Sequence, residues 1–110
     1  MKISDLISRP DITTLTNNPD TMREIKDGYI GDLLSWVMGR AKPQDVWITI
    51  MNNINIVAVA TLTDVSAIIL CEGVVPGADV IEKANEEEVV ILKSEKTAYQ
   101  LAKELGGEIE

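Results

Sequence analysis

Apolar and polar residues follow two alternating periodicities along this chain of 110 residues. Runs rich in β-branched residues, typical of strands, are separated by segments with apolar residues three and four positions apart, typical of helices. The pattern predicts strands at 11–16, 25–30, 46–51, 67–70 and 89–92. It predicts helices at 3–7, 33–38, 52–64, 78–85 and 95–105.

Capping and breaking residues suggest where these helices begin and end. Asp32 is expected to cap the helix at 33–38 and Ser94 the helix at 95–105, because short polar side chains bond to free backbone N–H groups. Gly39 is expected to end the first of them, and Gly106-Gly107 the last. Residues 108–110 are then expected to fray.

The segment 46–51 indicates the fold class, because it is almost continuously apolar and β-branched. Such strands are buried on both faces, as in parallel sheets covered by helices. The segment 52–64 fits either a strand or a helix, and a helix is predicted because parallel strands need a crossover between them. The order of elements therefore predicts one α/β domain over residues 1–110 with an open, mostly parallel sheet.

Composition and charge exclude several classes of function. Eighteen acidic against ten basic residues give a net charge of −8, which opposes binding to nucleic acid. The chain contains no histidine, so imidazole-based catalysis and imidazole metal sites are excluded. A lone cysteine, Cys71, in an apolar run fits a reducing cytoplasm, and no apolar run is long enough to span a membrane.

Known catalytic motifs are missing from the sequence. Neither the phosphate-binding loop nor the dinucleotide-binding glycine pattern occurs, so no nucleotide cofactor is expected. Ser35 and Cys71 have no base near them in sequence, and are interpreted as packing residues rather than nucleophiles. The acidic run 86–88 is interpreted as a solvated helix end rather than a metal site. We therefore predict no catalytic residue, no metal and no cofactor.

Small, polar and acidic residues follow several of the predicted strands. Ligands in open α/β sheets bind beyond the carboxyl ends of the strands, so these residues are candidates for a binding pocket. They also suit ordinary turns and helix caps, and the sequence leaves both interpretations open. The candidate ligand-binding residues are Gly31, Asp32, Asn52, Asn53, Asn55, Glu72 and Gly73.

The predicted helix at 33–38 carries more apolar residues than one buried stripe requires. We therefore expect part of it to contact a second copy of the chain. The candidate dimer-interface residues are Leu33, Leu34, Trp36 and Val37, with Met38 beside them.

Four stretches of the chain carry a family resemblance: GYIGDLLS at 28–35, WITI at 47–50, NIVAVA at 55–60 and IILCEG at 68–73. Together they resemble the DRTGG domain family. The resemblance implies a three-layer α/β/α sandwich with a mixed sheet of about five strands, like the N-terminal domain of HPr kinase/phosphorylase. It also implies dimerisation and a regulatory role, as in phosphotransacetylases and CBS-domain pyrophosphatases, and stand-alone members occur.

The residues that give the family its name are only partly present. Asp32 is kept, but Leu33 stands in place of the Arg; Cys71 and Glu72 stand in place of Thr and Gly, and Gly73 is kept. Losing Arg and gaining Glu disfavours binding of an anion. The sequence thus predicts a non-catalytic regulatory domain that acts as a homodimer and senses a ligand or a partner protein. The alternatives are an accessory subunit of a separately encoded kinase or redox enzyme, and a small-molecule enzyme that uses Asp32.

Overall fold

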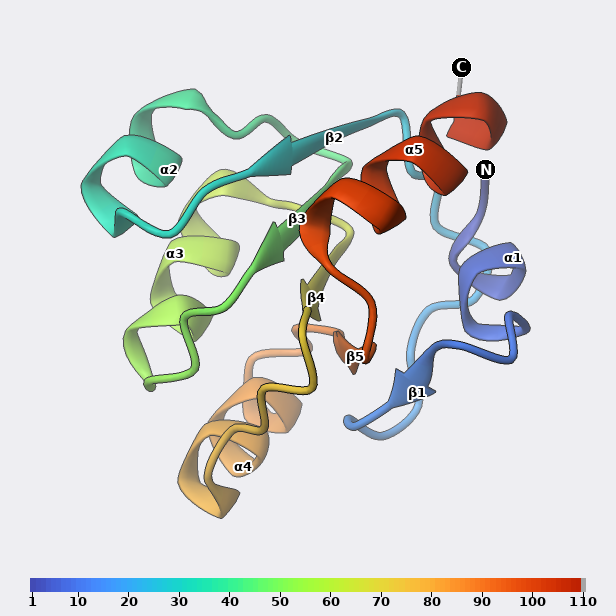
Figure 1. Cartoon of the computed structure of the whole chain (residues 1–110). Coiled ribbons are helices and arrows are strands. Elements are labelled where there is room, and N and C mark those ends of the chain that lie inside the picture. Colours follow the sequence, from blue (N-terminus) through green and yellow to red (C-terminus); the bar gives the residue numbers. More distant parts are fainter. Residues whose placement is uncertain (110) are drawn as a thin grey trace.

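The computed structural model describes residues 1–109, which form five helices and five strands (Figure 1). The helices are α1 (Ile3–Ile7), α2 (Leu34–Arg40), α3 (Asn55–Thr63), α4 (Ala78–Glu86) and α5 (Ala98–Ile109). The strands are β1 (Thr13–Thr14), β2 (Asp27–Ile30), β3 (Asp45–Thr49), β4 (Ala67–Leu70) and β5 (Ile91–Lys93).

The strands form one mixed sheet in the order β1-β5-β4-β3-β2. Strands β2 to β5 are parallel neighbours, with Val46 opposite Ala67 and Ile68 opposite Ile91, while β1 pairs antiparallel with β5. Every residue of β3 and β4 is buried. The buried strand predicted at 46–51 is thus confirmed for 46–49, but it is wrong for the last two residues, because β3 ends at Thr49 and Ile50 is 45% exposed. The predicted α/β class and the mostly parallel, mixed sheet are confirmed.

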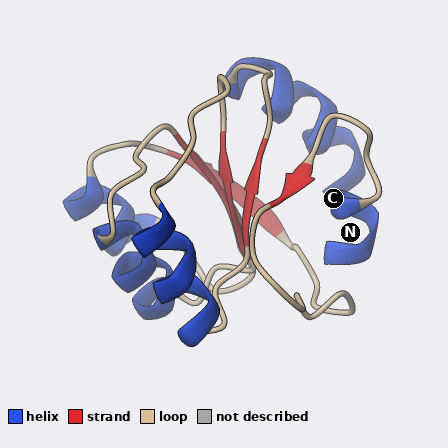
Figure 2. Ribbon diagram, turned by 90° about the horizontal axis from the view of Figure 1, so that it is seen from below, coloured by secondary structure: helices blue, strands red, loops and turns tan. Residues whose placement is uncertain are grey.

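Helices cover both faces of this sheet, so the domain has three layers (Figure 2). On one face, side chains of α2, α3 and α4 pack against Trp47, Ile68 and Leu70. On the other face, side chains of α1 and α5 pack against Ile48 and Ile69. Neighbouring residues of one strand thus serve opposite cores, as the alternation of strand side chains requires.

The helices that connect the parallel strands all lie on one face of the sheet. Because β2, β3, β4 and β5 are adjacent in chain order, the connections between them place α2, α3 and α4 on the same face. The prediction of a helix within 52–64 is confirmed by α3. Helix α5 follows β5, lies on the opposite face and reaches back to β2.

The first and last residues of several elements differ from the sequence prediction. The strand predicted at 11–16 is reduced to two residues, because Asp11 pairs with Arg9 and the Thr16 hydroxyl accepts the Ile91 N–H. Gly39 lies inside α2 rather than ending it, since the helix continues to Arg40.

Helix α5 does not stop at Gly106-Gly107 but continues to Ile109, so the prediction of a frayed tail is wrong for residues 108 and 109. The reason is tertiary: the Arg9 guanidinium pairs with Glu104 and with Glu108, the latter at 2.8 Å. The interaction of Arg9 with Glu108 supports the last turn beyond the glycines. Glu110, also predicted to fray, lies outside the described residues.

Within residues 1–109, no helix has both the length and the apolar character needed to cross a membrane.

The two tryptophans occupy opposite environments. Trp47, in the middle of β3, is fully buried, and its indole Nε1–H donates to the Gly31 carbonyl at 2.9 Å. Trp36, on α2, is 55% exposed, and the Arg40 guanidinium lies 4.0 Å from its ring centre. Trp47 therefore ties the end of β2 to β3, whereas Trp36 is available at the surface.

This contrast gives a matched pair of variants. Trp47→Phe removes the bond to Gly31 and leaves a gap in the core, so we expect it to lower the free energy of unfolding by about 1–3 kcal/mol. Trp36→Phe should change it by less than about 0.5 kcal/mol. Urea unfolding followed by circular dichroism measures both, and equal effects of the two variants would contradict the assigned roles.

Candidate functional site

The candidate site is the edge of the sheet at which β2, β3, β4 and β5 end, which we call the carboxyl edge. These strands are parallel, so the loops that follow them lie side by side. The loops span 31–33, 50–54, 71–77 and 94–97 and lead into α2, α3, α4 and α5. All seven predicted ligand-binding residues lie in these loops or at the first residue of α3.

Asp32 links the end of β2 to the end of β3. Its Oδ1 atom accepts hydrogen bonds from the Thr49 hydroxyl at 2.7 Å and from the Ile50 N–H at 3.0 Å. The prediction that Asp32 caps α2 is therefore wrong: the helix begins after Leu33, which makes no side-chain cap bond. Gly31, beside it, accepts the bond from Trp47 through its carbonyl.

The side chains of Asn52 and Asn53 hold the next loops in place, whereas Asn55 contributes a backbone N–H. Asn52 Nδ2 donates to the Val75 carbonyl at 2.9 Å and so joins the loop after β3 to the loop after β4. Asn53 Oδ1 accepts the Asn55 N–H at 2.9 Å at the start of α3. In this structure, Asn52 and Asn53 act as turn and capping groups.

Glu72 and Gly73 form a tight turn after β4. Both have left-handed backbone conformations, with φ of 58° and 73°. Their N–H groups donate to the carbonyls of Lys96 and Ser94, at 2.8 and 2.9 Å, which fixes the loop after β5. Glycine is favoured at Gly73 by its positive φ, whereas the Glu95 carboxylate near it belongs to a flexible exposed side chain that can move aside.

The loop after β5 is also held from its other side. Ser94 Oγ accepts the Lys96 N–H rather than capping α5, which begins later, next to Thr97. The Lys96 ammonium donates to the Glu104 carboxylate, and this hydrogen bond is the main reason that the pKa of Lys96 is raised. Lys96 thus points toward α5 and away from the turn at Glu72.

Cys71 lies near two acidic residues of the edge, Glu72 and Asp32. Its backbone N–H donates to the Thr49 carbonyl, and its thiol, which is 2% exposed, lies 3.7 Å from the same oxygen. Burial, then the charge of Glu72 and, more weakly, that of Asp32 raise the pKa of the thiol above its ordinary 9.0. The charges of Asp32 and Glu72 therefore both raise the pKa of the same thiol.

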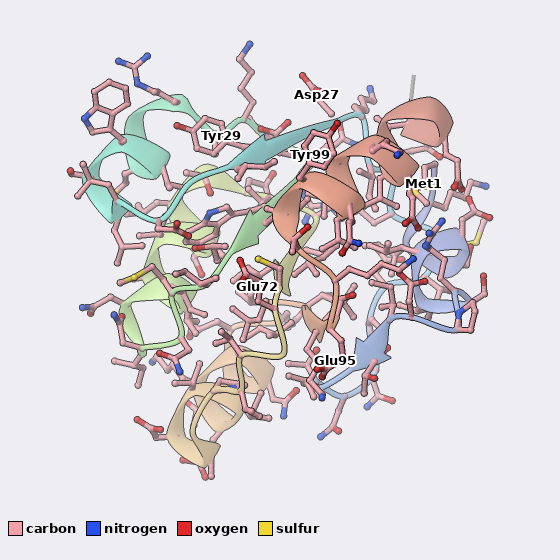
Figure 3. All side chains as sticks on the ribbon, in the orientation of Figure 1. Met1, Asp27, Tyr29, Glu72, Glu95 and Tyr99 are labelled. Atoms are coloured by element: carbon pink, nitrogen blue, oxygen red, sulfur yellow. The ribbon has the colours of Figure 1, made fainter. Side chains whose placement is uncertain are left out.

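The structure brings together residues that sequence reasoning did not select. The Glu95 carboxylate lies close to Gly73, and Thr49 and Val75 are hydrogen-bonding partners of Asp32 and Asn52. Figure 3 labels Glu72 and Glu95. Thr49 alone carried a signal, as a polar residue within an apolar run. Among residues 1–109 no three His, Cys, Asp or Glu side chains converge as a metal site would require.

Two cavities lie away from this edge, and a third, of about 470 Å³, borders it between α3 and α4, with Ile54 and Asn55 in its wall. One of about 600 Å³ lies at the opposite edge of the sheet, lined by Asn17, Arg23, Asn85 and Glu88 among others. A smaller one of about 390 Å³ lies between β2 and α5, with Gly28 and Gly106 in its walls. The carboxyl edge itself is a surface of short loops.

Fold and edge together define a small α/β/α sandwich whose polar loops gather at one end of a parallel sheet. The chain belongs to the DRTGG domain family, whose model matches residues 5–107. Among solved structures, it is similar to the CBS and DRTGG domains of the regulatory region of Clostridium perfringens pyrophosphatase, complexed with the activator diadenosine tetraphosphate. That likeness has a TM-score of 0.67 at 15% identity over 92% of this chain.

The chain spans 43% of the length of that pyrophosphatase fragment, and the likeness shows the fold. The search of curated proteins found no match.

The surroundings of Cys71 lead to a prediction about its reactivity. Because the thiol is buried and its pKa is raised, alkylation by iodoacetamide at pH 8 should be at least about tenfold slower in the folded protein than in urea. Glu72→Gln removes the largest raising charge, so its rate–pH curve should move to lower pH and its rate at pH 8 should rise a few-fold.

Glu82→Gln, on the exposed surface of α4, is the matched control and should leave the curve of the folded protein unchanged. Rapid labelling of the native wild type, with a midpoint below pH 9, would contradict the structural role assigned to Cys71.

Proposed function

We propose that this protein is a non-catalytic regulatory module of the cytoplasm that works as a homodimer and senses a small molecule or a partner protein at its carboxyl edge. One observation carries the proposal. The polar side chains of Asp32, Asn52 and Asn53 are bonded within the protein, while large apolar side chains around them are exposed. Such a surface suits recognition better than catalysis.

Two further findings support a regulatory role. The solved neighbour is described as a regulatory region with an activator bound, and its DRTGG domain has the fold seen here. The lone thiol at this edge, Cys71, is buried with a raised pKa, which is the reverse of an activated nucleophile.

The experiment compares binding with turnover. Purified protein is screened for thermal stabilisation with nucleotides, sugar phosphates and metal ions, the same mixtures are assayed for conversion, and co-purifying proteins are identified in the native host. We expect stabilisation by one ligand class, or one stoichiometric partner, with no conversion of any compound. Conversion that Asp32→Asn abolishes at an unchanged melting temperature would instead establish an enzyme.

Helix α2 supports the homodimer part of the proposal. Leu33, just before the helix, and Trp36 are 62% and 55% exposed, Leu34 is half-buried, and Val37 is buried in the core. Leu33, Trp36 and Arg40 recur at three- and four-residue spacing and so lie along one outer stripe. Tryptophan and arginine are the residues most enriched among those that dominate interface energies.

Trp36→Ala should therefore weaken self-association. We expect the dimer dissociation constant to rise at least about tenfold, with secondary structure and melting temperature unchanged. Light scattering and analytical ultracentrifugation over a concentration series measure it. Met22→Ala, which truncates another exposed apolar residue, is the control.

Added salt should tighten the wild-type dimer, because it screens the repulsion between two chains of charge −8. A wild-type protein that stays monomeric at high micromolar concentration would contradict the homodimer.

A further inference from the structure

The carboxyl edge collects most of the strongly exposed apolar side chains of the described chain. Of the ten large apolar residues that are exposed within residues 1–109, six lie at the ends of β2 and β3, in the adjoining loops or in the first turn of α5. These six form what we call the carboxyl-edge surface: Ile30, Leu33, Ile50, Ile54, Val75 and Tyr99.

Hydrogen bonds across the loops hold parts of this surface in place relative to one another. Asp32 joins the loop that holds Leu33 to Ile50, and Asn52 joins the loop that holds Ile54 to Val75. Tyr99, on α5, is 76% exposed and follows the loop whose backbone accepts the bonds from Glu72 and Gly73 (Figure 3). Apolar groups gathered in this way mark a docking site rather than the scattered exposure of an ordinary surface.

The charges within the carboxyl-edge surface are negative. Asp32, Glu72 and Glu95 are exposed in its loops. Lys93 lies 3.7 Å from Glu95 and offsets its charge, and Lys96 is turned toward Glu104. Among the ion pairs of residues 1–109, none involves Asp32 or Glu72, so these two carboxylates have no basic side chain to neutralise them.

Both departures from the family motif change the edge in the same direction. Leu33 replaces a cation by an exposed apolar side chain, and Glu72 replaces a glycine by an exposed carboxylate. The two changes make the edge less suited to an anion and more suited to a cation with apolar neighbours.

We propose that the carboxyl-edge surface docks a protein partner that presents a lysine or arginine flanked by aliphatic or aromatic side chains. The basic group lies against Asp32 and Glu72, and its neighbours cover Ile50 and Val75. A second copy of this chain fits poorly against Asp32 and Glu72, because it would oppose these carboxylates with its own; the homodimer contact proposed above lies on α2, with Leu33 at the boundary between the two surfaces. The inference rests on the proposed function, of which it specifies the form that binds a partner protein.

The test selects binding peptides without assuming the partner. Random peptides displayed on phage are panned on the full-length protein, and enriched sequences are synthesised and titrated by fluorescence anisotropy. We expect Lys or Arg beside Leu, Ile, Met or Phe, with affinity that falls as salt is raised. Glu72→Lys should weaken binding by about tenfold or more, and Val75→Ser should weaken it several-fold.

Glu82→Lys is the matched control, because it makes the same charge change at an exposed position of α4 and should leave affinity unchanged. Enriched peptides that lack basic residues, peptides that bind Glu72→Lys as tightly as wild type, or no enrichment at all would each overturn the inference. None of these outcomes bears on small-molecule sensing, whereas enzymatic turnover in the metabolite assay would overturn the proposed function itself.

Discussion

The burial of β3 and β4 on both faces is the constraint on which the rest of the structure depends. Residues such as Trp47 and Ile68 on one side, and Ile48 and Ile69 on the other, require helices above and below the sheet. Parallel pairing supplies α2, α3 and α4 as crossovers on one face, and the first and last helices, α1 and α5, cover the other. Parallel pairing also leaves the end of every parallel strand at one edge, so the proposed recognition surface is a by-product of how the core is covered.

This constraint also explains what could be predicted from the sequence. The apolar run at 46–51 indicated a parallel sheet, and the order of strands and helices along the chain predicted the α3 crossover and the gathering of Asp32, Asn52 and Glu72 at one edge. The ends of elements were less predictable. Asp32 was expected to cap α2, but its carboxylate bonds to Thr49 and Ile50, whose nearness depends on the pairing of β2 with β3.

The same limit applies to the site. Its candidate residues were found because they follow predicted strands, and the positions of these strands along the chain can be predicted from the pattern of apolar residues. Val75, Glu95 and Tyr99 were missed because their importance lies in exposure and in contacts between loops, which no spacing encodes. Glu72 was found both as a residue that follows a predicted strand and as a departure from the family motif. Its positive φ, which costs a non-glycine residue about 1 kcal/mol or more, is visible only in the structure.

The pairing of Arg9 with Glu104 and Glu108 has a consequence for how the domain folds. The paired residues are 95 and 99 positions apart, and Ile3 and Leu6 share a core with Leu101 and Leu105. The first and last helices therefore stabilise each other only after the whole sheet between them has formed. Contacts of such long range slow folding and make it cooperative. During synthesis on the ribosome, α1 is made long before α5, so it gains these stabilising contacts only after α5 has been added.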